Sequence, residues 1–95
     1  MNNGIYRIYQ PGQRLRKIRE ELGLTLSDVE KLSRCIAKKT QIMDYLISAE
    51  RVSQIENSNF LPSLYKLATL GFIYKLPSTE MFHIYGIDIR RQIES

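Results

Sequence analysis

The sequence has few of the residues that build metal sites, and it has no pair of cysteines. Its 95 residues include one cysteine, Cys35, one histidine, His83, and no tryptophan. A single cysteine cannot form an internal disulfide, and one cysteine with one histidine is too small a ligand set for zinc, haem or an iron–sulfur cluster. We therefore expect no metal site and no cofactor.

Long apolar runs and catalytic arrangements are missing as well. No stretch approaches the roughly 18 apolar residues that span a bilayer, and the first residues lack the apolar segment of a secretory signal. The chain shows no nucleophile, metal or phosphate-loop motif. These absences predict a soluble cytoplasmic protein that does not contact a membrane and is not an enzyme.

Charge is present but unevenly placed. Fourteen Lys and Arg residues against ten Asp and Glu give a net charge of +4, an ordinary total for this length. Residues 1–19 hold five cations and no acid, whereas residues 20–30 hold four acids and no cation. The basic opening segment is compatible with a nucleic-acid contact and equally with a solvated helix surface.

Apolar residues at helical spacing, with start and stop residues around them, predict an all-α chain, a compact bundle of about five short helices. The predicted helices cover residues 13–22, 26 to at least 33, 48–57, and 78–85, and a further helix begins at residue 63 and ends within residues 71–76. The side chains expected to face the core are Leu15, Ile18, Leu22, Val29, Leu32, Ile36, Val52, Ile55, Leu64, Leu67, Ala68, Leu70, Met81, Ile84 and Tyr85.

We expect one helical domain, residues 12–86, between an N-terminal arm of residues 1–11 and a C-terminal tail of residues 87–95. The tail carries apolar residues that suit a dimer contact or a linker. The pattern leaves residues 34–47 open, because this polar stretch either extends the second helix or forms a surface loop.

Three blocks of sequence carry a family resemblance. They are LRKIREELGLT at residues 15–25, VSQIEN at residues 52–57 and LPSLYKLA at residues 61–68. In this order they resemble the Xre/Cro family of lambda-repressor-like helix-turn-helix regulators. The resemblance implies a lambda-repressor-like bundle that binds double-stranded DNA as a homodimer and regulates transcription in the manner of a repressor.

The resemblance assigns residues 48–57 as the helix that reads bases. It implies that Ala49, Glu50 and Gln54 face base edges and that Ser48, Arg51 and Ser53 lie close to bases or phosphates. A glutamine can pair with adenine through two hydrogen bonds, and a glutamate can accept one from cytosine. An ordinary surface helix is the alternative for this segment.

Further residues are candidates for the phosphate backbone or for structural support. The charge and position of Arg7, Arg14, Arg16, Lys17, Asn57 and Asn59 suit phosphate contacts, and solvated surface is the alternative for each. Arg19 and Glu56 match an arginine–glutamate pair of the family. The resemblance implies a partly buried ion pair that joins the first helix to the recognition helix.

The chain departs from the family pattern between the two motif helices. Residues 34–47 exceed the usual short turn by about a dozen residues. Leu26 replaces a glutamine that commonly touches phosphate, and Glu30 replaces a small residue and would repel DNA if it faced the phosphates. Lys38 and Lys39, with Arg34, add cations to this insertion; a mobile surface loop is the alternative.

Three functions therefore remain open at this stage. The first is a sequence-specific transcriptional regulator that occupies an operator as a dimer. The second is an antitoxin that represses its own promoter and also blocks a toxin partner. The third is a protein-interaction module that keeps the fold but has lost DNA contact, a possibility that Leu26, Glu30 and the insertion favour.

Overall fold

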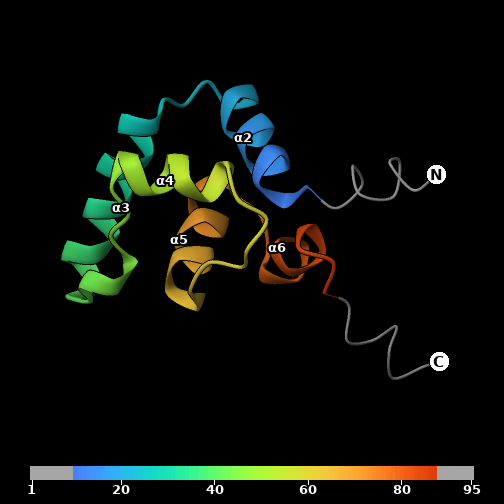
Figure 1. Cartoon of the computed structure of the whole chain (residues 1–95). Helices are drawn as coiled ribbons and strands as arrows, with labels where there is room; N and C mark the ends of the chain where they lie inside the picture. Colours follow the sequence, from blue (N-terminus) through green and yellow to red (C-terminus); the bar gives the residue numbers. More distant parts are fainter. Residues whose placement is uncertain (1–9, 88–95) are drawn as a thin grey trace, which may run out of the picture.

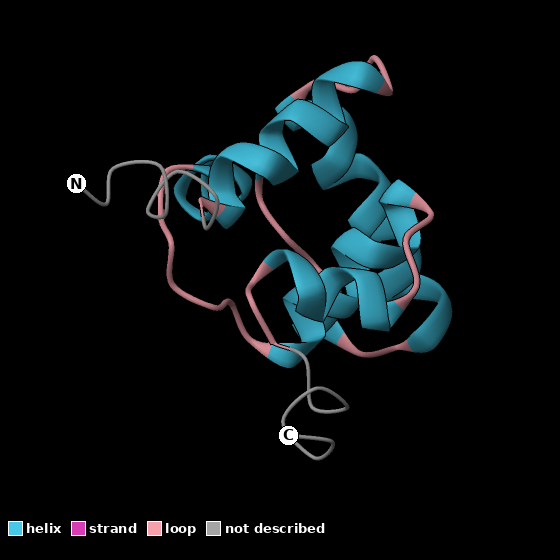
Figure 2. Cartoon of the chain, turned by 90° about the vertical axis from the view of Figure 1, so that its right-hand side faces the viewer, coloured by secondary structure: helices cyan, strands magenta, loops and turns pink. Residues whose placement is uncertain are grey.

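The computed structural model describes residues 10–87, which form a bundle of five α-helices and one 3-10 turn with no strand in this range (Figures 1 and 2). The elements are α2 (Pro11–Glu21), α3 (Leu26–Thr40), η1 (Met43–Tyr45), α4 (Ala49–Glu56), α5 (Leu64–Tyr74) and α6 (Ser78–Ile84). The predicted all-α fold of five short helices is confirmed. Arg7 and residues 88–95 of the predicted tail lie outside the described residues. No helix in the described part is long and apolar enough to cross a membrane.

Most helix starts follow the local sequence signals. The Thr25 hydroxyl accepts a hydrogen bond from the Asp28 amide at 3.0 Å, and the Asp28 carboxylate accepts one from the Thr25 amide at 2.9 Å, which completes a capping box. Ser48 caps α4 in the same way through its hydroxyl. The first helix begins at Pro11, two residues before the predicted start, because proline suits the first helical position.

The core lies where the five helices meet. It contains Leu15, Val29, Ile47, Val52, Ile55, Leu67, Leu70, Tyr74, Met81 and Ile84. Four side chains that we expected to face it are exposed instead, namely Leu22, Leu32, Leu64 and Ala68. On α3 the buried stripe runs through Val29, Ser33 and Ala37 at four-residue spacing, which turns Leu32 outward.

The stretch at residues 34–47 begins as helix and not as a loop. Its first half continues α3 to Thr40, and Gln41 then ends the helix with a left-handed backbone conformation. Residues 41–48 run back along the bundle to the start of α4, and we call them the return segment. Its residue Ile47 is fully buried in the core. The extra length is therefore two further turns of helix plus the chain needed to come back.

Candidate nucleic-acid interface

Helix α4 is amphipathic, with an exposed polar face and an opposite face that is buried in the bundle. Val52, Ile55 and Glu56 are buried, whereas Glu50, Gln54 and Asn57 are exposed. The last three are spaced by four and three residues, so they lie in one stripe along the helix. The remaining predicted contact residues flank this stripe, with Ser48 and Arg51 exposed and Ala49 and Ser53 partly buried.

Two hydrogen bonds hold side chains of this outer face in place. Arg51 donates from Nη1 to the amide oxygen of Gln54 at 3.1 Å. Asn57 donates from Nδ2 to the carbonyl oxygen of Ser53 at 2.9 Å. The Gln54 amide oxygen can accept two hydrogen bonds, so the contact with Arg51 leaves one acceptor position and the amide NH2 group open. Arg51 keeps its other donors.

The C-terminal end of α4 is fixed by a buried ion pair with α2. Arg19 donates to both carboxylate oxygens of Glu56, at 2.6 and 3.0 Å, and also to the carbonyl oxygen of Leu24 at 2.8 Å. Arg19 is 8% exposed and Glu56 4%. The hydrogen bond to Glu56 raises the pKa of Arg19, which keeps the guanidinium charged. The pair has the bidentate geometry that arginine forms with carboxylates.

The same end of α4 lies against the start of α2. Gln13 donates from its side-chain amide to the carbonyl oxygen of Glu56 at 3.3 Å. A Cβ atom on Gly12 would overlap the carbonyl oxygens of Glu56 and Ser58. Gly12 therefore permits a close backbone approach between α2 and α4, a role that its position before a predicted helix did not reveal.

The N-terminal end of α4 is held by α3. One carboxylate oxygen of Glu30 accepts a hydrogen bond from the Ala49 amide at 2.8 Å, and the other pairs with Arg34 at 2.7 Å. The Ala49 amide, with a smaller effect of Arg34, lowers the pKa of Glu30. Glu30 thus satisfies a free amide at the helix start, and its charge is paired within the chain. Figure 1 shows α4 running from α3 at its start to α2 at its end.

The return segment is tied to α3 and α5. The Ser33 hydroxyl, fully buried, accepts from the Ile47 amide at 2.9 Å and lies 3.2 Å from the Ile47 carbonyl oxygen. Lys66 donates to the carbonyl oxygens of Asp44 and Leu46 at 2.9 and 2.6 Å. Thr69 donates to the carbonyl oxygen of Tyr45 at 2.9 Å. These backbone contacts carry no sequence signal, because a carbonyl accepts regardless of its side chain.

The two lysines predicted as a pair in the insertion lie on different sides of α3. Lys38 is exposed on α3. It lies eight residues after Glu30, about 12 Å further along the axis and about 80° around it. Lys39 instead lines a groove between α3 and α5. Of the other predicted cations, Arg14 is exposed on α2, and Arg16 pairs with Glu20 at 3.1 Å.

Comparisons with protein-family models, curated proteins and solved structures found no match to this chain. Between residues 10 and 87, no group of three or more His, Cys, Asp and Glu side chains is placed to hold a metal ion. What the arrangement offers is a short polar helix face, supported at both ends by the neighbouring helices.

Proposed function

We propose that this chain is a sequence-specific double-stranded-DNA-binding transcriptional regulator, resembling the Xre/Cro regulators and acting as a homodimer on an operator. The observation that carries the proposal is the support of α4. A helix reads base edges only if it is held rigidly while its outer side chains stay accessible. Here Glu56 and Ala49, at the two ends of the helix, are both bonded to neighbouring helices, and Glu50 and Gln54 between them are exposed.

The charges around α4 suit a division between base and phosphate contacts. The outer face carries one acid, Glu50, and one cation, Arg51, so it adds no net charge of its own. Attraction to the phosphates then comes from exposed cations on the neighbouring helices, of which Arg14 and Lys38 are our candidates. Glu30 does not oppose this attraction strongly, because Arg34 and the start of α4 compensate its charge.

Exposed apolar side chains after α4 support the homodimer. Phe60, Leu61 and Leu64 are all exposed and follow α4 closely in the chain. Large exposed apolar side chains on a small bundle suit an interface with another chain. A homodimer formed through these residues would need to present its two α4 helices to half-sites about 34 Å apart.

A binding titration tests the proposal. The chain is titrated by fluorescence anisotropy against a duplex from upstream of its own gene, at two salt concentrations. We expect affinity to fall as salt rises, since phosphate contacts release counterions. Gln54→Ala should relax the preference at one base pair and leave the salt slope unchanged, whereas Lys38→Ala should weaken all duplexes alike and reduce the slope by about 1.

Lys39→Ala is the matched control for Lys38→Ala. The two residues are neighbours in the chain, but Lys39 lies in the groove between α3 and α5. DNA affinity of Lys39→Ala should equal that of the unmodified chain. Absence of any salt-sensitive binding by the unmodified chain would reject the regulator and leave the interaction module. Equal losses in the two lysine variants would reject the placement of the DNA on the α4 side of α3.

A further inference from the structure

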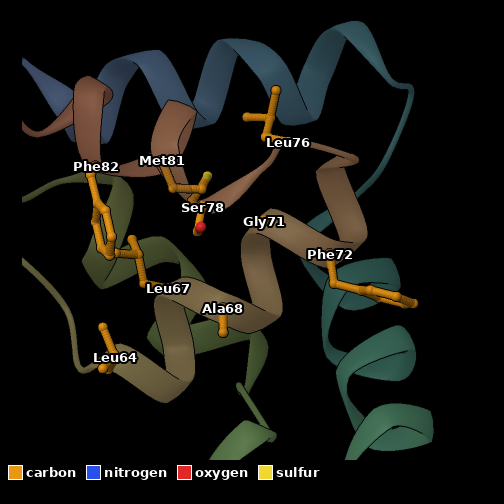
Figure 3. A pocket seen from close by; sticks show the side chains of 9 residues that line it. All are labelled: Leu64, Leu67, Ala68, Gly71, Phe72, Leu76, Ser78, Met81 and Phe82. Carbon is orange, nitrogen blue, oxygen red and sulfur yellow. The ribbon is translucent and has the colours of Figure 1, made fainter.

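A groove of about 820 Å³ lies between α3 and α5, and no residue of α4 lines it. Its apolar walls come from Leu32, Ile36, Phe72 and Ile73. Phe72 is 76% exposed and Leu32 is 43% exposed, which is unusual for side chains of this size on a small bundle. Figure 3 draws a neighbouring pocket that Leu67, Phe72 and Met81 help to line, and in it the Phe72 ring projects from α5 toward α3.

The groove is separated from α4 by the geometry of α3. Glu30 contacts the start of α4 and pairs with Arg34, whereas Leu32, Cys35 and Lys39 line the groove. A ligand could therefore occupy the groove without touching the outer face of α4. The existence of the groove does not depend on whether α4 binds DNA.

The polar rim of the groove is positively charged. Lys39 and Lys75 line it, and no acidic side chain does. The start of α5 lies beside the chain that follows α3, because Lys66 binds the carbonyl oxygens of Asp44 and Leu46. The two helices thus run in opposite directions, as Figure 1 also shows. Lys39 near the end of α3 and Lys75 after the end of α5 therefore mark opposite ends of the groove.

We propose that this groove binds an amphipathic helical segment of a partner protein, with apolar residues on one face and an acidic residue toward each end. Helix-in-groove recognition uses apolar anchors at three- and four-residue spacing, and acidic ends complement the two lysines. The open shape and protruding Phe72 fit a segment that lies along the surface, whereas small-molecule sites enclose most of their ligand.

The charge pattern disfavours the other candidate occupants. In a symmetric dimer the groove of one copy would face the same groove of the other. Lys39 and Lys75 would then lie opposite like charges. The chain's own outer segments are poorly matched as well. Residues 1–9 contain one arginine and no acid, and residues 88–95 balance two acids with two arginines.

The test uses Cys35, the single cysteine of the chain, which is exposed and lines the groove. Two synthetic peptides share a helical leucine stripe and differ only at their ends, which carry either glutamates or lysines. The rate at which Cys35 of the full chain reacts with a thiol reagent is measured with each peptide. The glutamate peptide should slow the reaction several-fold and the lysine peptide should not, because only the first matches the rim.

Charge reversal sharpens the test. In the Lys39→Glu, Lys75→Glu double variant the preference should invert, so that the lysine peptide protects Cys35. The matched control, Lys17→Glu with Lys31→Glu, changes two exposed lysines that do not line the groove and should keep the original preference. Phe72→Ser should abolish protection by either peptide with the thermal melting temperature unchanged, since this side chain is largely exposed.

Four outcomes would overturn the proposal. The first is that neither peptide protects Cys35 at any concentration, and the second is that both peptides protect it equally. The third is that a simple anionic amphiphile such as decanoate protects it where the glutamate peptide does not, which would assign a small-molecule site. Protection that grows with protein concentration alone would assign the groove to a second copy. DNA binding should persist in all the groove variants, so failure here is distinguishable from failure of the regulator proposal.

Discussion

The two ends of α4 are anchored by different kinds of interaction. At its C-terminal end Glu56 is buried and paired with Arg19, so charge is held inside the bundle. At its N-terminal end Glu30 is partly exposed and contacts the backbone of Ala49, and the return segment behind it is held by hydrogen bonds. The first anchor depends on two side chains of fixed identity. The N-terminal anchor consists of several weaker contacts, some of which involve backbone carbonyl oxygens as acceptors.

This difference determines how each end responds to substitution. A buried ion pair adds little net stability, because desolvation offsets much of the attraction, but removing one partner leaves an uncompensated charge in the core. Removing the partner of a buried amide also destabilises the fold, but by less, because the group left without a hydrogen bond is uncharged. A partly exposed carboxylate costs least to remove, because water replaces its partners.

The largest effect is expected for Arg19→Ala. Loss of the guanidinium leaves the Glu56 carboxylate buried without a partner, and we expect the free energy of unfolding to fall by about 3–5 kcal/mol. Urea unfolding measures the change, and DNA affinity should fall with it. Arg16→Ala is the control, because Arg16 forms an exposed pair with Glu20. An Arg19→Met, Glu56→Met double variant should recover most of the loss; equal stability of Arg19→Ala and the unmodified chain would refute the pairing.

An intermediate effect is expected for Ser33→Ala. The substitution leaves the buried Ile47 amide without its hydroxyl partner, which should lower the free energy of unfolding by about 1–3 kcal/mol. Ser27→Ala, at an exposed position on the first turn of α3, serves as control. Hydrogen exchange of the Ile47 amide should accelerate in Ser33→Ala. A variant as stable as the control would show that the return segment is not held by this contact.

The smallest effect is the pH dependence at the N-terminal end. The folded-state pKa of Glu30 is lowered from 4.5, so its carboxylate stabilises the fold above that pH. The contribution fades as the pH falls below 4.5 and is lost once the pH passes the folded-state pKa. The free energy of unfolding, measured from neutral pH to below 4.5, should fall more steeply in the unmodified chain than in Glu30→Gln. Parallel pH profiles would contradict the contact with Ala49.

Parts of this arrangement were predictable from the sequence. The all-α fold, the Thr25 capping box and the Ser48 cap follow from local signals that act within one turn of helix. The Arg19–Glu56 contact was suggested by the family resemblance, and the structure contains it. The prediction that Leu32 faces the core is wrong, because the buried positions of α3 are Val29, Ser33 and Ala37, and Ser33 bonds to the return segment.

The N-terminal anchor could not be predicted for a related reason. Glu30 was considered only as a residue that would repel DNA, and nothing in the sequence showed that α4 would begin beside Glu30 and Arg34. Lys66 and Thr69 bind carbonyl oxygens of the return segment, and such contacts depend only on the tertiary path. The separate sides of Lys38 and Lys39 became clear only once α3 was known to reach Thr40.

The outer face of α4 is the centre of the functional proposal, and mapping by NMR tests it most directly. Isotope-labelled full chain is titrated with the upstream duplex, and amide chemical shifts are followed residue by residue. The proposal predicts that the largest changes fall on residues 48–57, with smaller ones near Arg14 and Lys38, while Leu32 and Phe72 in the groove stay unchanged. Changes confined to the groove, or none at α4, would contradict DNA binding by this helix.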